Sequence, residues 1–238
     1  MVLLGFLIGV AKGGVGAVGA LLTTLLSLIM PVSKAVGVLV PLFIVGDIFA
    51  LWTYWRAWDG GLVWRTLPVG VLGAVAGTYL LASLPTNTLR VALAVFVLVI
   101  VGSKFLSDRI QRLRFQSRAW HGPAAGLASG VASGMFNNGG PPYSAYLLLQ
   151  HLPARTFIGT AALFFAALNV VKVPSLLIAR VLDLPLLLSV WWAVLFIPVG
   201  ILAARRLLTR LNQQWFENVI LVLLVVSSAV LIWQGLGQ

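Results

Sequence analysis

Long apolar segments with very few charges are the feature that most restricts how this 238-residue chain can fold. Only 9% of its residues are charged and 61% are hydrophobic, whereas a soluble domain carries about 25% charged residues. A helix needs roughly 20 apolar residues to cross a bilayer, and the alternation typical of a porin-type barrel is absent. The sequence therefore predicts an all-α integral membrane protein. Its eight apolar segments lie at about 2–29, 32–55, 61–83, 86–104, 119–150, 154–179, 184–207 and 214–235.

Two of these segments contain residues that interrupt a helix. Segment 119–150 includes Ser133–Pro142, with two asparagines, three glycines and two prolines, and segment 2–29 includes Lys12–Gly16. In a helix interior a glycine costs about 1 kcal/mol and a proline about 3 kcal/mol. We therefore expect a broken helix in each segment, although packing glycines with a simple kink are an alternative. Broken helices at corresponding places in two halves of a membrane protein point to a binding site.

The order of glycines and prolines indicates an internal duplication. Matching positions recur 121 to 130 residues apart: Gly5, Gly9 and Gly13 with Gly126, Gly130 and Gly134; Pro31 and Gly37 with Pro153 and Gly159; Pro68 and Gly70 with Pro198 and Gly200; and Asp47 with Asn169. We interpret 1–104 and 119–238 as two membrane repeats joined by a basic linker, 105–118.

The distribution of basic residues favours one topology. The net charge is +11, and most basic residues lie between apolar segments, so membrane orientation explains them better than nucleic-acid binding. If all eight segments span with the 103–118 loop inside, eight Lys and Arg lie inside and six outside. If the broken segments are re-entrant, eleven lie inside and three outside. The second model gives three full spans per half, hence two inverted repeats, each a re-entrant helix plus three transmembrane helices, with the 103–118 loop in the cytoplasm.

The charged residues at membrane depth predict the sign of the substrate's charge. Lys12 and Lys172 against Asp47 leave one net positive charge inside the membrane, which favours an anion over a cation. Asp47 is either the structural partner of Lys12 or the carrier of a coupling proton. Asn169 is its counterpart in the other repeat and lies one turn before Lys172.

The two breaks supply the chemistry that an anion needs. Helices starting near Gly16 and Pro142 would direct free N–H groups and their positive ends toward the membrane centre, and asparagine amides donate without adding charge. We therefore expect the two halves to rock about a site between the breaks. The expected substrate-binding residues are Lys12, Gly13, Gly14, Gly16, Asn137, Asn138, Gly139, Gly140 and Lys172.

No motif of a soluble enzyme occurs. The sequence lacks HExxH, a phosphate-binding GxxxxGK[ST] and GxSxG, and its two histidines and five acidic residues are too scattered for a metal site. We expect neither enzymatic activity nor a cofactor.

The residues around the breaks resemble the TauE/SafE family of sulfite exporters. The resemblance rests on Gly5–Gly16 with Pro31 and Ala35-Val36-Gly37, and on Gly126, Gly130, Gly134 and Asn138–Pro141 in the second half. It implies a multi-pass permease of the plasma membrane, the inner membrane of a bacterium, for an anion such as sulfite, thiosulfate or an organosulfonate. A non-sulfur organic anion or a small neutral solute remains the alternative. The expected partners are this anion, the lipid bilayer and a coupling proton or sodium ion, with the oligomeric state open.

Overall fold

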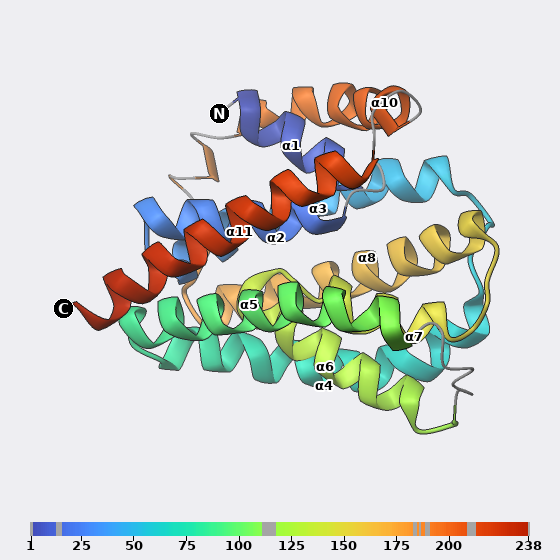
Figure 1. Ribbon diagram of the computed structural model, residues 1–238, viewed down its shortest axis with the longest axis horizontal. Coiled ribbons are helices and arrows are strands. Elements are labelled where there is room, and N and C mark those ends of the chain that lie inside the picture. Colours follow the sequence, from blue (N-terminus) through green and yellow to red (C-terminus); the bar gives the residue numbers. More distant parts are fainter. Residues whose placement is uncertain are drawn as a thin grey trace.

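The described part of the chain is helical throughout (Figure 1). The computed structural model describes residues 2–12, 16–110, 118–182, 185, 187–188, 191–208 and 213–237. Its helices are α1 (Val2–Lys12), α2 (Gly16–Ile29), α3 (Val32–Thr53), α4 (Gly60–Ser83), α5 (Thr86–Ile110), α6 (His121–Phe136), α7 (Gly140–Leu148), α8 (Ala154–Ile178), the 3₁₀ helix η1 (Trp191–Phe196), α10 (Ile197–Leu208) and α11 (Gln213–Leu236).

Five of the described helices are long and apolar enough to cross a membrane. They are α3, α4, α8, the Thr86–Ser103 part of α5 and the Asn218–Leu236 part of α11. Large apolar side chains on them point outward, for example Leu72, Val99 and Trp233. A surface of this kind faces lipid favourably, so the prediction of a helical, multi-pass membrane protein agrees with the structure.

The predicted span 184–207 differs from the other five. Residues 191–196 form a 3₁₀ helix and α10 begins only at Ile197, while 183–184, 186 and 189–190 lie outside the described residues. Pro198 stands in the first turn of α10, where a missing N–H costs no helical hydrogen bond. From Trp191 on, this segment forms one short apolar helix, Trp191–Ala203, which starts as a 3₁₀ turn and is shorter than the five candidate spans.

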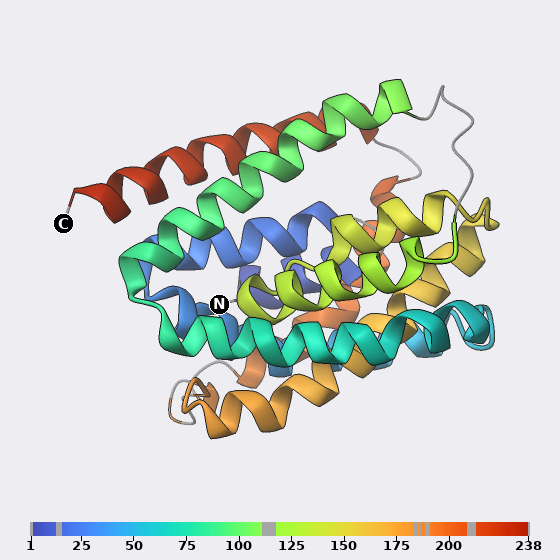
Figure 2. The same ribbon diagram turned by 90° about the horizontal axis from the view of Figure 1, so that it is seen from below.

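The second predicted break lies at the turn of a helical hairpin. Figures 1 and 2 show α6 running to the middle of the bundle and α7 returning toward the end from which α6 came. Helices α1 and α2 form a similar hairpin that starts from the opposite end, with residues 13–15 outside the described part. The ends of the two hairpins therefore lie at opposite ends of the helical bundle.

Two helix pairs come into unusually close contact through glycine. A Cβ at Gly130 of α6 would overlap the carbonyl oxygen of Gly70 on α4, and a Cβ at Gly200 of α10 would overlap the carbonyl oxygen of Phe6 on α1 and lie 2.9 Å from Cα of Gly9. Backbones can approach so closely only where both surfaces lack side chains, as in other small-residue crossings of membrane helices. Each pair is thereby held in one register.

The buried apolar residues form two cores. The first contains mainly residues of α1, α2, α3, α5, α10 and α11, among them Ile8, Leu39 and Leu224, and it also includes Leu81 of α4, Phe136 of α6 and Leu176 of α8. The second is built on α4, α7 and α8, where the Tyr143 ring stacks on Phe164 with 3.9 Å between ring centroids. Each core joins helices from both halves of the sequence.

Candidate functional site

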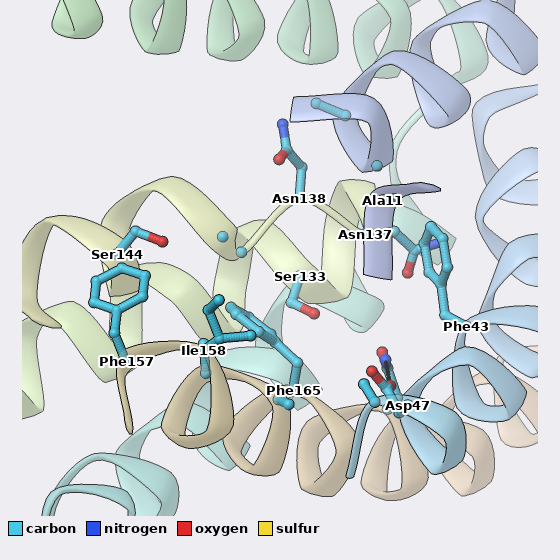
Figure 3. A pocket seen from close by; sticks show the side chains of 18 residues that line it. Ala11, Phe43, Asp47, Ser133, Asn137, Asn138, Ser144, Phe157, Ile158 and Phe165 are labelled. Atoms are coloured by element: carbon cyan, nitrogen blue, oxygen red, sulfur yellow. Dashed lines mark hydrogen bonds between the residues drawn. The ribbon is translucent and has the colours of Figure 1, made fainter. Parts of the chain in front are cut away.

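A cavity of about 220 Å³ lies beside the break between α6 and α7 (Figure 3). Residues of α1, α2, α3, α6, the break, α7 and α8 line it, so it touches both cores. We call it the break cavity. Its lining residues are Ala11, Gly19, Ala20, Phe43, Asp47, Ala50, Ser133, Asn137, Asn138, Gly139, Gly140, Ser144, Phe157, Ile158, Ala161, Ala162, Phe165 and Asn169.

The chain turns at the end of α6 because Asn137 adopts a left-handed conformation. Its φ is 56°, and its backbone N–H donates to the Ser133 carbonyl at 3.0 Å. Asparagine tolerates this region better than most residues other than glycine. Gly139 follows, where a Cβ would overlap the Ser129 carbonyl oxygen, and the Ser129 hydroxyl donates to the Gly139 carbonyl. The break is therefore a fixed turn built from these residue types.

The Asn137 side chain connects the break to two other helices. Its Nδ2 donates to the Val36 carbonyl of α3 at 3.0 Å, and its Oδ1 accepts from Nζ of Lys172 on α8 at 2.8 Å. Its amide oxygen and one donor are thus used within the protein. Asn137 therefore holds the break against α3 and holds the Lys172 ammonium group in place. The side-chain amide of the next residue, Asn138, is the nearby donor that can bind a solute.

Lys172 brings a buried ammonium group directly behind the cavity wall. Its side chain is 1% exposed, and Nζ donates to the carbonyl and hydroxyl oxygens of Ser133, both at 3.1 Å. Ser133 and Asn137, which hold this ammonium group, both line the cavity. A positive charge therefore lies one residue layer away from any bound solute.

Asp47 and Asn169 face each other across the interface of α3 and α8. Nδ2 of Asn169 donates to Oδ2 of Asp47 at 2.6 Å, and both residues are buried and line the cavity. The two positions that correspond in the repeat comparison are thus in direct contact. Lys12, the partner expected for Asp47, has its side chain outside the described residues. Asn169 also lies one turn before Lys172 on α8.

Asn138 offers a hydrogen-bond donor that no described residue uses. The residue is 4% exposed, lines the cavity, and its Nδ2 has no partner within the described part of the chain. A buried polar atom without a partner is costly and calls for a ligand or water. Gly140 beside it occupies the first position of α7, where backbone N–H groups lack helical partners. Pro141 and Pro142 carry no N–H, so fewer backbone donors remain at this helix start than a full first turn would provide.

The other half of the predicted site is only partly described. Gly13, Gly14 and the side chain of Lys12 lie outside the described residues. Gly16 begins α2, and Ala11, directly before Lys12, lines the break cavity. The end of α1 therefore borders the same cavity as the second break, while the roles expected for Lys12, Gly13 and Gly14 stay predictions.

Several lining residues were missed by the sequence reasoning. Phe157, Ala161 and Phe165 on α8 line the cavity together with Asn169, and Ser133 lies four residues before Asn137 on α6. The spacing of four between Phe157, Ala161, Phe165 and Asn169 places them on one helix face. This spacing of four, ending at the polar residue Asn169, is the signal that could have revealed the face.

Two further observations limit the chemistry and the relationships of the site. Within the described residues, no group of three or more His, Cys, Asp or Glu side chains could hold a metal ion.

A family model described as sulfite exporter TauE/SafE matches residues 1–231. No curated protein and no solved structure matches the chain.

Proposed function

Because the chain belongs to the sulfite exporter TauE/SafE family, we propose that it is a secondary transporter that moves a small sulfur-containing anion, such as sulfite, thiosulfate or an organosulfonate, across the membrane by alternating access. Family membership and the five candidate spans support a permease embedded in the bilayer rather than an enzyme. The anion binds in the break cavity.

The buried Nδ2 of Asn138, which has no hydrogen-bond partner among the described residues, is the observation that carries this proposal. It lines a cavity whose wall is held by the Lys172 ammonium group, so a neutral donor and a nearby positive charge act on the same space. Figure 3 draws Asp47 and Asn138 on opposite sides of the site. The anionic group therefore binds near Asn138, Gly139 and Gly140, with Lys172 compensating its charge.

We include the first break in the binding site. Lys12, Gly13, Gly14 and Gly16 complete it from the α1–α2 hairpin, which the position of Ala11 on the cavity wall supports. Asp47, a carboxylate on the cavity wall, is the candidate carrier of the coupling proton or sodium ion.

The two halves, 1–104 and 119–238, are inverted repeats in this proposal. The hairpins start from opposite ends of the bundle. The α6–α4 crossing at Gly130 and Gly70 corresponds to the α1–α10 crossing at Gly9 and Gly200, with the same sequence offsets that indicated the duplication. We also propose that 105–118 is a cytoplasmic linker and that the protein lies in the inner membrane of a bacterium.

The units that rock are the two cores rather than the two halves of the sequence. Helix α4 of the first half packs with α6, α7 and α8, and α10 of the second half packs with α1. Since a Cβ at either crossing would overlap backbone, neither pair can slide, and each moves as one body. The α3–α8 interface between the cores, with Asp47 and Asn169, borders the cavity and is where movement opens it.

Flux into proteoliposomes tests the function. We expect saturable uptake of labelled sulfite, thiosulfate or a labelled sulfonate by liposomes containing the full chain, and none by empty liposomes. A labelled non-sulfur carboxylate and a neutral polyol in parallel separate the alternative substrates. If none of the sulfur anions shows saturable flux or binding, the proposal is wrong.

A further inference from the structure

A second cavity, of about 610 Å³, lies where α3 and α5 begin and where α4 and α8 end. All four helices contain candidate membrane spans, and Figure 1 shows these ends on the side of the molecule where the C-terminus lies. The cavity shares no lining residue with the break cavity. We call it the end pocket, and it lies at the level where the spans leave the membrane. Its lining includes Lys34, Leu81, Thr86, Leu89, Arg180 and Leu182.

The charged side chains that line the end pocket are basic. Lys34 lies in the first turn of α3 and Arg180 follows α8, and both are exposed. No acidic residue occurs among the described lining residues. Asp183 is close to Arg180 in the sequence but lies outside the described residues, and counting it still leaves these three residues with a net positive charge. A ligand of complementary charge is therefore an anion.

Two helix starts add to the positive charge of Lys34 and Arg180. Ser33 of α3 and Thr86 of α5 line the end pocket, and both lie in first turns, where backbone N–H groups have no partner within the helix. The positive ends of two helix dipoles are therefore located at this pocket. They support an anion there but would not by themselves make a site.

Arg180 has a backbone conformation that favours glycine. Its φ is 54°, its N–H donates to the Leu177 carbonyl at 3.1 Å, and the N–H of Val181 donates to the Leu176 carbonyl at 3.0 Å. Glycine is the usual residue at such a helix end, because a side chain is strained there. An arginine at this position keeps a guanidinium group at the pocket despite the strain, which is typical of a residue with a role beyond folding.

The surroundings of the end pocket favour a lipid headgroup over an anion free in water. The apolar side chains of Leu177 and Ile178, directly before the lining residues of α8, are exposed, and Leu81 and Leu89 belong to the lining. A free phosphate is only slightly larger than a water molecule, which takes up roughly 30 Å³, so it would leave most of 610 Å³ unused. A phospholipid brings a larger headgroup, and its acyl chains match the apolar surface beside the pocket.

We propose that the end pocket binds the headgroup of an anionic phospholipid. Its phosphate lies between Lys34 and Arg180, and an acyl chain runs along Leu177 and Ile178. Because α3 belongs to the first core and α8 mainly to the second, the bound lipid joins the two cores at this end and stabilises the folded protein. This inference does not depend on anion transport through the break cavity.

Two lipids with identical acyl chains and different headgroup charge test the proposal. Dioleoyl phosphatidylglycerol and dioleoyl phosphatidylcholine are added to the purified full chain in detergent. Binding is followed by native mass spectrometry and stability by the melting temperature. We expect phosphatidylglycerol to bind more tightly and to raise the melting temperature further, and both effects to shrink with added salt.

Variants of the two basic residues locate the site. A basic side chain beside an anionic headgroup strengthens binding by about fivefold, so Lys34→Gln and Arg180→Gly should each weaken phosphatidylglycerol binding by about that factor, and together by about 25-fold. Arg180→Gly keeps the fold, because glycine suits a φ of 54°. Arg56→Gly is the matched control: Arg56 is exposed, has a φ of 56°, follows the other end of α3 and lies outside the pocket lining. It should keep the affinity.

Each outcome supports or overturns the proposal. Weaker phosphatidylglycerol binding in Lys34→Gln and Arg180→Gly, with Arg56→Gly unchanged, supports it. No preference over phosphatidylcholine, or unchanged affinity in the double variant, overturns it. An equal loss in Arg56→Gly would indicate attraction to surface charge in general and overturns the assignment to the end pocket. If inorganic phosphate binds as tightly as the lipid through the same two residues, the ligand is a free anion and the lipid assignment is wrong. Sulfite flux, which tests the proposed function, is a separate measurement.

Discussion

Replacing Lys172 with glutamine removes the buried positive charge behind the break cavity. Its Nζ lies 2.8 Å from the Asn137 amide oxygen, and Asn137 lines the cavity. Adding one contact layer places an anion roughly 6 to 8 Å from the ammonium group. At an effective dielectric constant of about 20, two unit charges at that distance attract by about 2 to 3 kcal/mol.

That energy corresponds to an anion affinity about 30- to 100-fold weaker in Lys172→Gln. Glutamine retains an amide that can donate to Asn137 or Ser133, so the loss is mainly one of charge. Calorimetric titration with methanesulfonate and the concentration dependence of sulfite flux both measure it. Lys34→Gln is the matched control, because it removes the same charge from an exposed residue outside the cavity lining.

If Lys172→Gln weakens anion affinity by less than threefold, while its melting temperature in detergent is unaltered, the electrostatic role of Lys172 is refuted. It would favour a neutral solute, whose binding does not depend on this charge. The same measurement with a neutral polyol therefore belongs beside it.

Three further comparisons of variants test the scaffold that holds the site, each by thermal or denaturant unfolding in detergent. Gly130→Ala should destabilise the protein by about 1 to 3 kcal/mol, because its Cβ overlaps the backbone of α4. Gly102→Ala, where a Cβ meets nothing within 4 Å, should be neutral, and equal effects at the two sites would contradict the tight crossing. Asn137→Ala should be about 1 kcal/mol less stable than Asn137→Gly, since both lose the side-chain bonds but only glycine suits a φ of 56°; a reversed order would exclude backbone strain there. Alanine substitutions of Asp47 and Asn169 should show a coupling energy of about 1.5 to 3 kcal/mol in a double-mutant cycle, and additive effects would show that the 2.6 Å bond contributes nothing.

The location of the second break could be predicted because its cause is local. Asn137–Pro142 combines a left-handed asparagine, two glycines and two prolines, and each disfavours a continuous helix whatever surrounds it. The helix boundaries at Phe136 and Gly140 follow directly from this composition. The correspondence of Asp47 and Asn169 was also accessible from matching the two halves, but their contact was not, because a sequence match does not give a distance.

The partners of individual side chains could not be predicted in the same way. Two neighbouring asparagines in a sequence do not show which of them bonds within the protein. Asn137 bonds to Val36 and Lys172, whereas Nδ2 of Asn138 has no partner among the described residues, because the position of α3 decides which amide is satisfied. The packing of α4 against α6, and of α10 against α1, likewise could not be predicted. It depends on contacts between glycines that lie far apart in the sequence. The 3₁₀ start of residues 191–208 was not predictable from an apolar composition that suits an α-helix throughout.

The position of a bound anion tests the central claim most directly. Selenite has the shape and charge of sulfite, and its selenium gives an anomalous signal in crystals of the full chain. The account predicts a selenium peak within about 4 Å of Nδ2 of Asn138, as expected for an oxyanion that accepts a hydrogen bond from that amide. A peak elsewhere in protein that binds selenite in solution, with the break cavity empty, would contradict the account.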